Sequence, residues 1–179
     1  MQNVPKAFKR REAIGSSVNY MGSLLTFLAE SKDTGGAFSL FEILLKPGNE
    51  PPPHIHHTED ELYYVLEGEA SVYIEEEEFE IKSGDCIFLP REKAHAFIVR
   101  AERFRMLFLT QPGGAEGYFR TMMSSPASIL ELPQEAPTYS TTDVQEAIDL
   151  GTQYGLEFLD PQRTKELLPG FYNAQLSRA

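Results

Sequence analysis

The stretch HIHHTEDELYYVLEG, from His54 to Gly68, holds three of the four histidines of the chain, followed at once by three acids. Three prolines stand directly before it, which favours an extended backbone and rules out a helix there. Residues two positions apart on an extended strand face the same side. We therefore expect His54 and His56 to project together, and we interpret His57 as a surface histidine. Two imidazoles on one face supply half of a metal site.

A carboxylate and a third histidine would complete this site. Glu61 begins the next predicted strand and can lie opposite the paired histidines, so it is our first choice, with Glu59 in the intervening turn as the second. His95 directly precedes a later predicted strand, AFIVR, and can enter the same barrel. We predict that His54, His56, Glu61 and His95 bind one divalent first-row transition metal (Fe, Mn, Ni, Co, Cu or Zn) with coordination positions left for chemistry.

Short strand patterns fill the first two thirds of the chain. The predicted strands cover residues 23–28, 38–45, 62–66, 71–74, 79–82, 86–89, 96–100 and 104–110. Turn residues recur about every eight to twelve positions, which is typical of an all-β sandwich or barrel and leaves no room for βαβ crossovers. The acids Glu75 to Glu78 are interpreted as the solvated tip of a hairpin. Cys86, in the strand CIFL, is predicted to be a buried core thiol.

The last third predicts short helices. Thr142 to Gln145 looks like a capping box, and the helix that it begins is expected to stop at Gly155. Its apolar face would consist of Val144, Ala147, Ile148 and Tyr154. Asp160-Pro161 predicts a second helix, PQRTKELL, that ends at Pro169-Gly170.

The pattern predicts a β-barrel domain over residues 1–135 and a helical extension over residues 136–179. These helices are too short for a domain of their own, so we expect them to pack on the barrel or on a second subunit. An open-edged barrel of this size tends to pair its exposed strands with another copy, which predicts a homodimer.

Composition limits the classes of partner. The chain has 179 residues, 41% of them hydrophobic, which is enough for one real core. Its formal net charge of -11 disfavours binding to nucleic acid and to anionic membranes. No apolar run approaches the roughly 20 residues of a membrane span, and the N-terminal segment MQNVPKAFKRREAIG lacks the apolar region of a signal peptide. The single cysteine excludes an internal disulfide. We expect a cytoplasmic protein that binds a small molecule.

The spacing of these residues resembles the two motifs of the cupin family. The first motif is a Gly, five residues, His-x-His, three or four residues, Glu, six residues and a Gly, and it is matched by Gly48, His54, His56, Glu61 and Gly68. The 15 residues between the motifs, Glu69 to Ser83, match the short spacer of one-barrel cupins. The resemblance implies a double-stranded β-helix, also called a jelly roll, with His54, His56, Glu61 and His95 as metal ligands.

The second cupin motif is matched with two departures. Gly84, Pro90 and His95 stand where the family has them, but Glu92 replaces a glycine and Val99 replaces an asparagine. Glu92 would carry backbone strain if its position requires a positive φ. Neither change removes a metal donor.

A narrower resemblance, over about Val18 to Pro161, is to single-domain cupins of the quercetin 2,3-dioxygenase-like group. Such proteins cleave the central ring of a flavonol with O₂ and release carbon monoxide. The resemblance implies an oxygen-dependent ring-cleaving dioxygenase in which Glu61 holds the metal, accepts the substrate proton, or does both. Tyr63, Phe97 and Phe108 are candidates for an apolar substrate pocket, with plain core packing as the alternative. A non-catalytic binding or sensing cupin and a cupin isomerase are the alternative functions.

Overall fold

The computed structural model describes residues 5–122, 124–135 and 137–177. One set of strands comprises β1 (Ser17–Tyr20), β2 (Ser23–Ala29), β3 (Ser39–Leu45), β5 (Asp60–Glu67), β8 (Cys86–Leu89), β10 (Phe104–Gln111) and β11 (Ser124–Pro126). A second set comprises β4 (His54–His56), β6 (Glu69–Ile74), β7 (Glu77–Lys82), β9 (His95–Val99) and β12 (Leu156–Phe158). The helices are η1 (Ile14–Ser16), α1 (Ser31–Thr34), α2 (Glu116–Thr121), α3 (Thr141–Gln153), α4 (Pro161–Leu167) and α5 (Pro169–Leu176).

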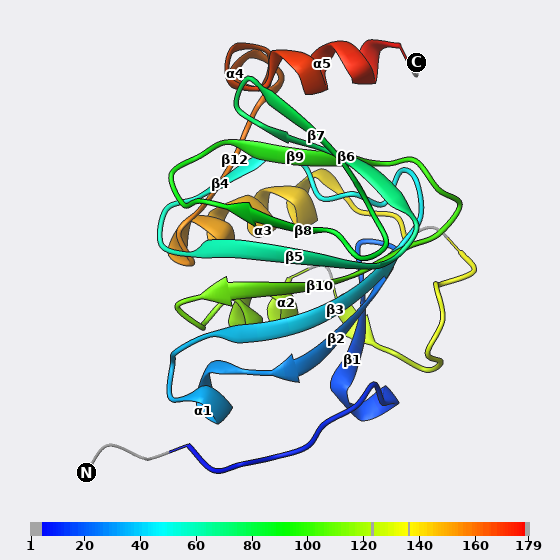
Figure 1. Cartoon of the computed structure of the whole chain (residues 1–179), viewed down its shortest axis with the longest axis vertical. Coiled ribbons are helices and arrows are strands. Elements are labelled where there is room, and N and C mark those ends of the chain that lie inside the picture. Colours follow the sequence, from blue (N-terminus) through cyan, green and yellow to red (C-terminus); the bar gives the residue numbers. More distant parts are fainter. Residues whose placement is uncertain (1–4, 123, 136, 178–179) are drawn as a thin grey trace.

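The strands form two antiparallel sheets that face each other (Figure 1). Within the described residues, the first sheet has seven strands in the order β11-β1-β2-β3-β10-β5-β8, and the second has five in the order β12-β4-β9-β6-β7. Neighbours far apart in the sequence, such as β3 and β10 or β4 and β12, pair directly. The architecture is the all-β, jelly-roll-type sandwich that the strand spacing predicts.

The main core lies between the two sheets. Strand β10 shows why, since its residues alternate strictly between buried and partly exposed positions. Its inward side chains Phe104, Met106 and Phe108 join Phe41 of β3 and Val72 of β6 in one buried cluster. Burying apolar area at about 25 cal/mol per Å² is the main term that holds the sheets together.

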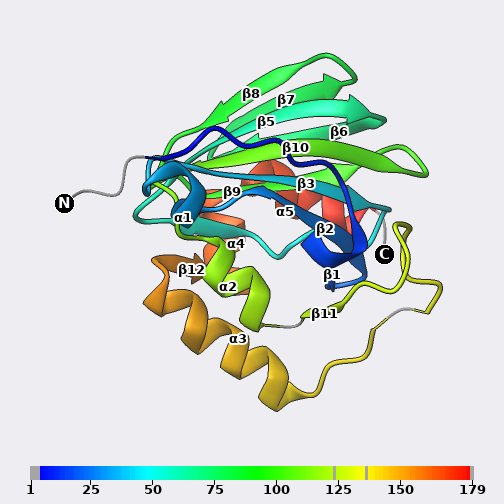
Figure 2. The same ribbon diagram turned by 90° about the horizontal axis from the view of Figure 1, so that it is seen from below.

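The C-terminal helices cover the outer face of the five-stranded sheet. Leu168 and Phe171, around the junction of α4 and α5, pack in a second buried cluster with Ile55, Tyr73 and Ile98. By contrast, α2 and α3 lie together at one side of the sandwich, beside β12 (Figure 2). Strand β12 pairs antiparallel with β4, so the C-terminal segment completes the five-stranded sheet. None of the helices in the described part of the chain is long and apolar enough to cross a membrane.

The helix predictions need three corrections. Helix α3 begins two residues earlier than predicted, because Ser140 is its N-cap and forms the capping box with Asp143. Val144 and Ile148 are exposed, and the buried side of α3 consists of Ala147 and Gly151. The chain does not end its helical structure at the Pro-Gly pair, since Pro169 begins α5. Proline fits the first turn of a helix as well as the position after one.

The predicted burial of Cys86 is wrong. The residue is exposed, because β8 is the edge strand of its sheet and Cys86 sits opposite Tyr64 on the outward face. The expected strain at Glu92 is present, with a φ of 64°. The acidic hairpin tip is narrower than expected: Glu75 and Glu76 form the turn, whereas the next two acids already belong to β7.

Candidate metal centre

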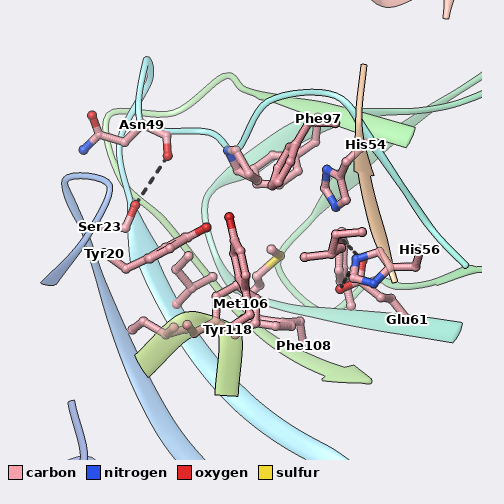
Figure 3. A pocket seen from close by; sticks show the side chains of 17 residues that line it. Tyr20, Ser23, Asn49, His54, His56, Glu61, Phe97, Met106, Phe108 and Tyr118 are labelled. Carbon is pink, nitrogen blue, oxygen red and sulfur yellow. Dashed lines mark hydrogen bonds and ion pairs between the residues drawn. The ribbon is translucent and has the colours of Figure 1, made fainter. Parts of the chain in front are cut away.

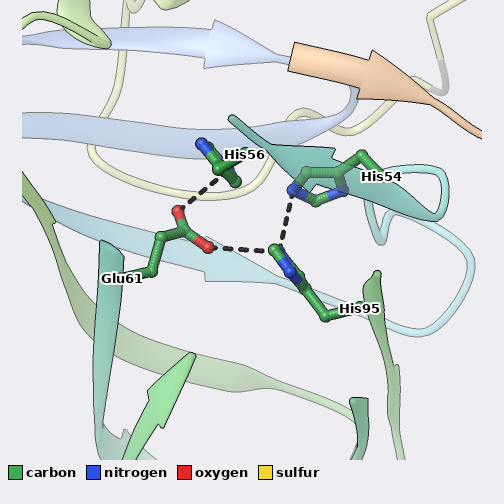
Figure 4. Close-up of side chains that lie close together, drawn as sticks. All are labelled: His54, His56, Glu61 and His95. Atoms are coloured by element: carbon green, nitrogen blue, oxygen red, sulfur yellow. Dashed lines mark hydrogen bonds and ion pairs between the residues drawn. The ribbon is translucent and has the colours of Figure 1, made fainter. Parts of the chain in front are cut away.

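Four side chains from both sheets meet at one end of the sandwich (Figure 4). His54 and His56 lie on β4, and His95 begins β9 directly opposite His54 in the ladder. Glu61 comes from β5 in the facing sheet. The two-residue period of β4 thus puts His54 and His56 on one face. The pairing of β4 with β9 brings His95 beside them, and the packing of the two sheets brings Glu61 opposite.

The donor atoms of these residues converge closely. One nitrogen or oxygen from each of the four lies within 4.8 Å of all the others, and all four side chains are buried. His54 Nε2 is 3.1 Å from His95 Nε2. Glu61 Oε1 is 3.4 Å from His56 Nε2, and Glu61 Oε2 is 3.3 Å from His95 Nε2. The structure therefore brings together the four residues that the spacing singles out.

Hydrogen bonds outside the cluster fix the tautomers of two histidines. His54 Nδ1 lies 2.8 Å from the carbonyl oxygen of Pro52, and His95 Nδ1 lies 3.2 Å from that of Lys93. A carbonyl oxygen only accepts, so both Nδ1–H groups donate. In the neutral rings, two Nε2 lone pairs then face each other. This contact is repulsive by itself, and a cation relieves it, so the donor set fits a divalent first-row metal.

The protonation states support the same conclusion. Burial, together with the neighbouring His95 and His56, holds the pKa of His54 well below its usual value. Burial alone would raise the pKa of Glu61, but the three histidines lower it well below its ordinary range. Glu61 is therefore ionised and His54 neutral near pH 7. These are the forms in which a carboxylate and an imidazole bind metals.

Glu59 lies outside the converging set and contacts His56 from behind. Its Oε2 atom is 3.4 Å from His56 Nδ1 and accepts a hydrogen bond of 2.7 Å from Thr58. Burial would lower the pKa of His56, but Glu61 and Glu59 together raise it. Glu59, our second choice as a ligand, is thus placed to orient His56 instead.

His57 is turned away from the cluster to the surface. Its Nδ1 atom is 2.8 Å from Glu92 and its Nε2 atom 3.1 Å from Glu157. The hydrogen bond with Glu92 is the main reason why the pKa of His57 is raised. Both ring nitrogens are therefore engaged on the outside of the protein.

The cluster lies at one end of a cavity between the sheets (Figure 3). About 620 Å³ of this space is not filled by atoms, part of it open to solvent. Most of the side chains that line the cavity are aliphatic or aromatic. The three pocket candidates Tyr63, Phe97 and Phe108 all line it. Tyr63 also donates a hydrogen bond of 2.8 Å to Glu61 Oε2.

The sequence pattern missed much of the cavity wall. Leu156 and Phe158 of β12 line it because they pair in register with His56 and His54. Tyr20 and Tyr118 close the opposite end. A three-residue strand is too short to show a period, and single tyrosines carry no spacing signal. Only the tertiary structure identifies these residues.

Comparison with known proteins places this site in a family. The cupin domain model matches residues 41–110, which include all four converging side chains. An uncharacterised protein of Methanocaldococcus jannaschii is 39% identical over 57 residues, or 32% of this chain and 46% of that protein. Quercetin 2,3-dioxygenase of Bacillus subtilis is 26% identical over 95 residues, or 53% of this chain and 28% of that protein. The chain thus spans less than half the length of either relative.

A solved structure agrees at the level of the fold. The nucleoside dehydratase Pac13 from Streptomyces superposes with a TM-score of 0.50 and 15% identity, over 69% of this chain and 95% of that one. Identity this low shows a shared fold and nothing about the reaction. With the jelly-roll sandwich and the convergent histidines, the match shows that the chain contains a cupin domain over residues 41–110.

Proposed function

We propose that this cupin is a metal-dependent dioxygenase that uses O₂ to open the ring of a flavonol-like or other small aromatic hydroxy compound. The observation that carries the proposal is the position of the donor set: three imidazoles and a carboxylate converge at the end of an apolar cavity. The similarity to the quercetin 2,3-dioxygenase of Bacillus subtilis supports the choice of reaction.

In this proposal His54, His56, Glu61 and His95 hold one divalent metal. When bound there, the metal would stabilise the deprotonated hydroxyl oxygen of the substrate and provide the site for O₂ chemistry. The paired strands β4 and β9 fix two of the imidazoles rigidly, since His54 and His95 are direct partners in the ladder. The proposed ligands thus lie on strands of the two sheets, which supports a rigid site.

Glu61 is the proposed base in this mechanism. Its Oε2 atom already accepts a hydrogen bond from Tyr63. The carboxylate is therefore oriented with Oε1 toward His56 and can take the proton of the substrate hydroxyl. Burial and the nearby Glu61 charge raise the pKa of Tyr63 well above its ordinary value, so Tyr63 stays a neutral donor. Phe97 and Phe108 flank the ring of the substrate.

An assay in air tests the proposal directly. Protein loaded in turn with iron, manganese, cobalt, nickel or copper is incubated with quercetin, and the loss of flavonol absorbance and the release of carbon monoxide are followed together. We expect turnover with at least one metal, and we expect Glu61→Gln to lower it by about 100-fold or more. Metal content measured on the same samples separates a lost base from a lost metal.

Two other results are informative. No turnover with any of these metals contradicts the flavonol reaction while leaving the metal centre intact. A rise in Tm with quercetin but no product would instead favour a cupin that binds or senses its ligand.

A further inference from the structure

The cavity has a second polar wall, far from the four converging side chains. Tyr20, at the end of β1, and Tyr118, in α2, bring their hydroxyl groups into the cavity there (Figure 3). Both side chains are almost fully buried, with 5% and 2% of their surface exposed. In this view the two hydroxyl groups point toward the same part of the cavity. Together they form a polar spot in a wall that is otherwise mainly aliphatic and aromatic.

Other polar groups at this end are already committed. Ser23 Oγ donates to the backbone oxygen of Asn49 at 3.4 Å, and Asn49 Nδ2 donates to the backbone oxygen of Gly22. Each phenol hydroxyl holds one hydrogen and two lone pairs, so it can both donate to and accept from a ligand. The Asn49 amide also turns away from the cavity, whereas the hydroxyls of Tyr20 and Tyr118 point into it, so these two groups are the best placed to serve a ligand.

Both tyrosines are held in fixed positions before any ligand arrives. The ring of Tyr20 meets Phe119 edge-on at 5.2 Å between centroids, and the ring of Tyr118 packs between Phe119 and Phe158 at 5.6 and 6.2 Å. The turn after Tyr20 is fixed by the hydrogen bond from Asn49. Groups that are ordered in advance bind with a smaller loss of entropy.

The charge at this wall limits the class of ligand. Burial raises the pKa of Tyr20 well above its ordinary value and that of Tyr118 to about 12, so both phenols are neutral. Among the described residues that line the cavity there is no lysine or arginine. A carboxylate or phosphate placed here would lose its hydration without gaining a cation. A neutral hydroxyl or carbonyl oxygen would be fully satisfied.

We propose that Tyr20 and Tyr118 form a second binding subsite, which takes a neutral hydroxyl or carbonyl oxygen at the far end of a flat aromatic ligand. The other end of this ligand lies at the metal centre, so the inference rests on the proposed function and narrows its substrate class. The substrate is then an aromatic compound with oxygen groups at both ends, and it carries no acid or phosphate at the end remote from the metal.

Three flavonols that differ by one hydroxyl group test this subsite. The probes are 3-hydroxyflavone, 3,7-dihydroxyflavone and 3,4′-dihydroxyflavone, titrated under nitrogen into the metal-loaded, full-length protein so that no O₂-dependent turnover occurs. One added hydrogen bond in a buried site corresponds to about a five- to tenfold gain in affinity. We expect one of the dihydroxy probes to bind more tightly than 3-hydroxyflavone by this factor.

Hydroxyl deletions assign the gain to the tyrosines. The measured quantity is the affinity for the tighter dihydroxy probe divided by the affinity for 3-hydroxyflavone. In Tyr20→Phe and Tyr118→Phe we expect this ratio to fall toward one, while the affinity for 3-hydroxyflavone itself changes less than about twofold. The matched control is Tyr64→Phe, because Tyr64 is 41% exposed and lies outside the cavity. A purely structural role of the tyrosines would change the affinity for all three probes alike, not the ratio between them.

Failure of the subsite can be told from failure of the proposed reaction. A ratio near one in the wild-type protein, an unchanged ratio in both Phe variants, or no binding of any probe each overturns the subsite. The affinity ratio of the wild-type protein tests the subsite even if one of the Phe variants does not fold. If the ratio behaves as expected but none of the probes is turned over in air, the subsite stands and the dioxygenase reaction fails.

Discussion

The two ends of the cavity are built by different physical means. At the metal end, individual hydrogen bonds hold the polar side chains. The backbone carbonyls of Pro52 and Lys93, for example, accept hydrogen bonds from the histidine rings in the cluster. At the far end, Tyr118 is held mainly by ring packing against Phe119 and Phe158. The four converging side chains at the metal end lie within the matched cupin domain, whereas Tyr20 and Tyr118 at the far end lie outside it. In the proposed function, the matched domain would supply the metal ligands, and the flanking segments would supply the tyrosines of the second subsite.

The largest effect is expected from breaking the metal end at His95. His95→Gln removes one of the converging nitrogens, so we expect metal binding and any metal-dependent activity to be lost. Metal bound at roughly 100 to 1,000 times its Kd adds about 3 to 4 kcal/mol to the free energy of unfolding. A chelator should therefore lower the Tm of the wild-type protein and leave that of His95→Gln unchanged.

His57 provides the control for this experiment. It is also a histidine between carboxylates, but it lies on the surface and outside the cluster. His57→Gln should keep full metal content by elemental analysis, together with the response to the chelator. Equal metal content in His95→Gln and the wild-type protein would refute the assignment of His95 as a ligand.

A smaller effect is expected at Glu59, behind the metal end. Its removal in Glu59→Ala leaves His56 Nδ1 without its carboxylate, and such partners typically contribute about 10- to 100-fold to metal affinity. Competition with a chromogenic chelator measures this change. Glu157→Ala is the matched control, because it removes the carboxylate beside His57 in the same way. Identical affinities for the two variants would mean that Glu59 does not orient the ligand.

Much of the metal end could be predicted from the sequence. Strand period alone separates His54 and His56 from His57, and the fixed motif spacing leads to His95 without any knowledge of the ladder. The structure adds what spacing cannot contain, namely that Glu59 faces the back of His56. The alternation of apolar residues could not reveal that Cys86 is exposed, since it does not show which face of an edge strand is covered.

Almost none of the far end could be predicted. Tyr20 and Tyr118 are nearly a hundred positions apart and meet only because α2 folds back beside β1. Phe158 enters the cavity through a three-residue strand whose register is set by pairing with β4. Local propensity is weak in segments this short, so tertiary contacts decide where the side chains point.

Helix α2 at the far end nevertheless has a polar anchor, Glu116 in its first turn. Its carboxylate accepts hydrogen bonds from the Ser31 backbone N–H at 2.8 Å, from the Ser31 hydroxyl and from Ser39 Oγ at 2.6 Å. Ser39 Oγ also accepts from the Gly114 backbone N–H, so the amide of Glu116→Gln would leave the Ser39 hydrogen without an acceptor. We expect this variant to lower the free energy of unfolding by about 1 to 2 kcal/mol at pH 7.

The pH dependence distinguishes a charged anchor from simple packing. Burial would raise the pKa of Glu116, but the hydrogen bonds from Ser31 and Ser39 lower it below the ordinary value of 4.5. Its stabilisation is therefore fully present above pH 4.5 and is lost as the pH falls through the lower folded value. Urea unfolding should show the gap between wild type and Glu116→Gln shrinking from pH 7 to about pH 3, with exposed Glu146→Gln as the control. A constant gap would mean that packing alone holds α2, and with it Tyr118, in place.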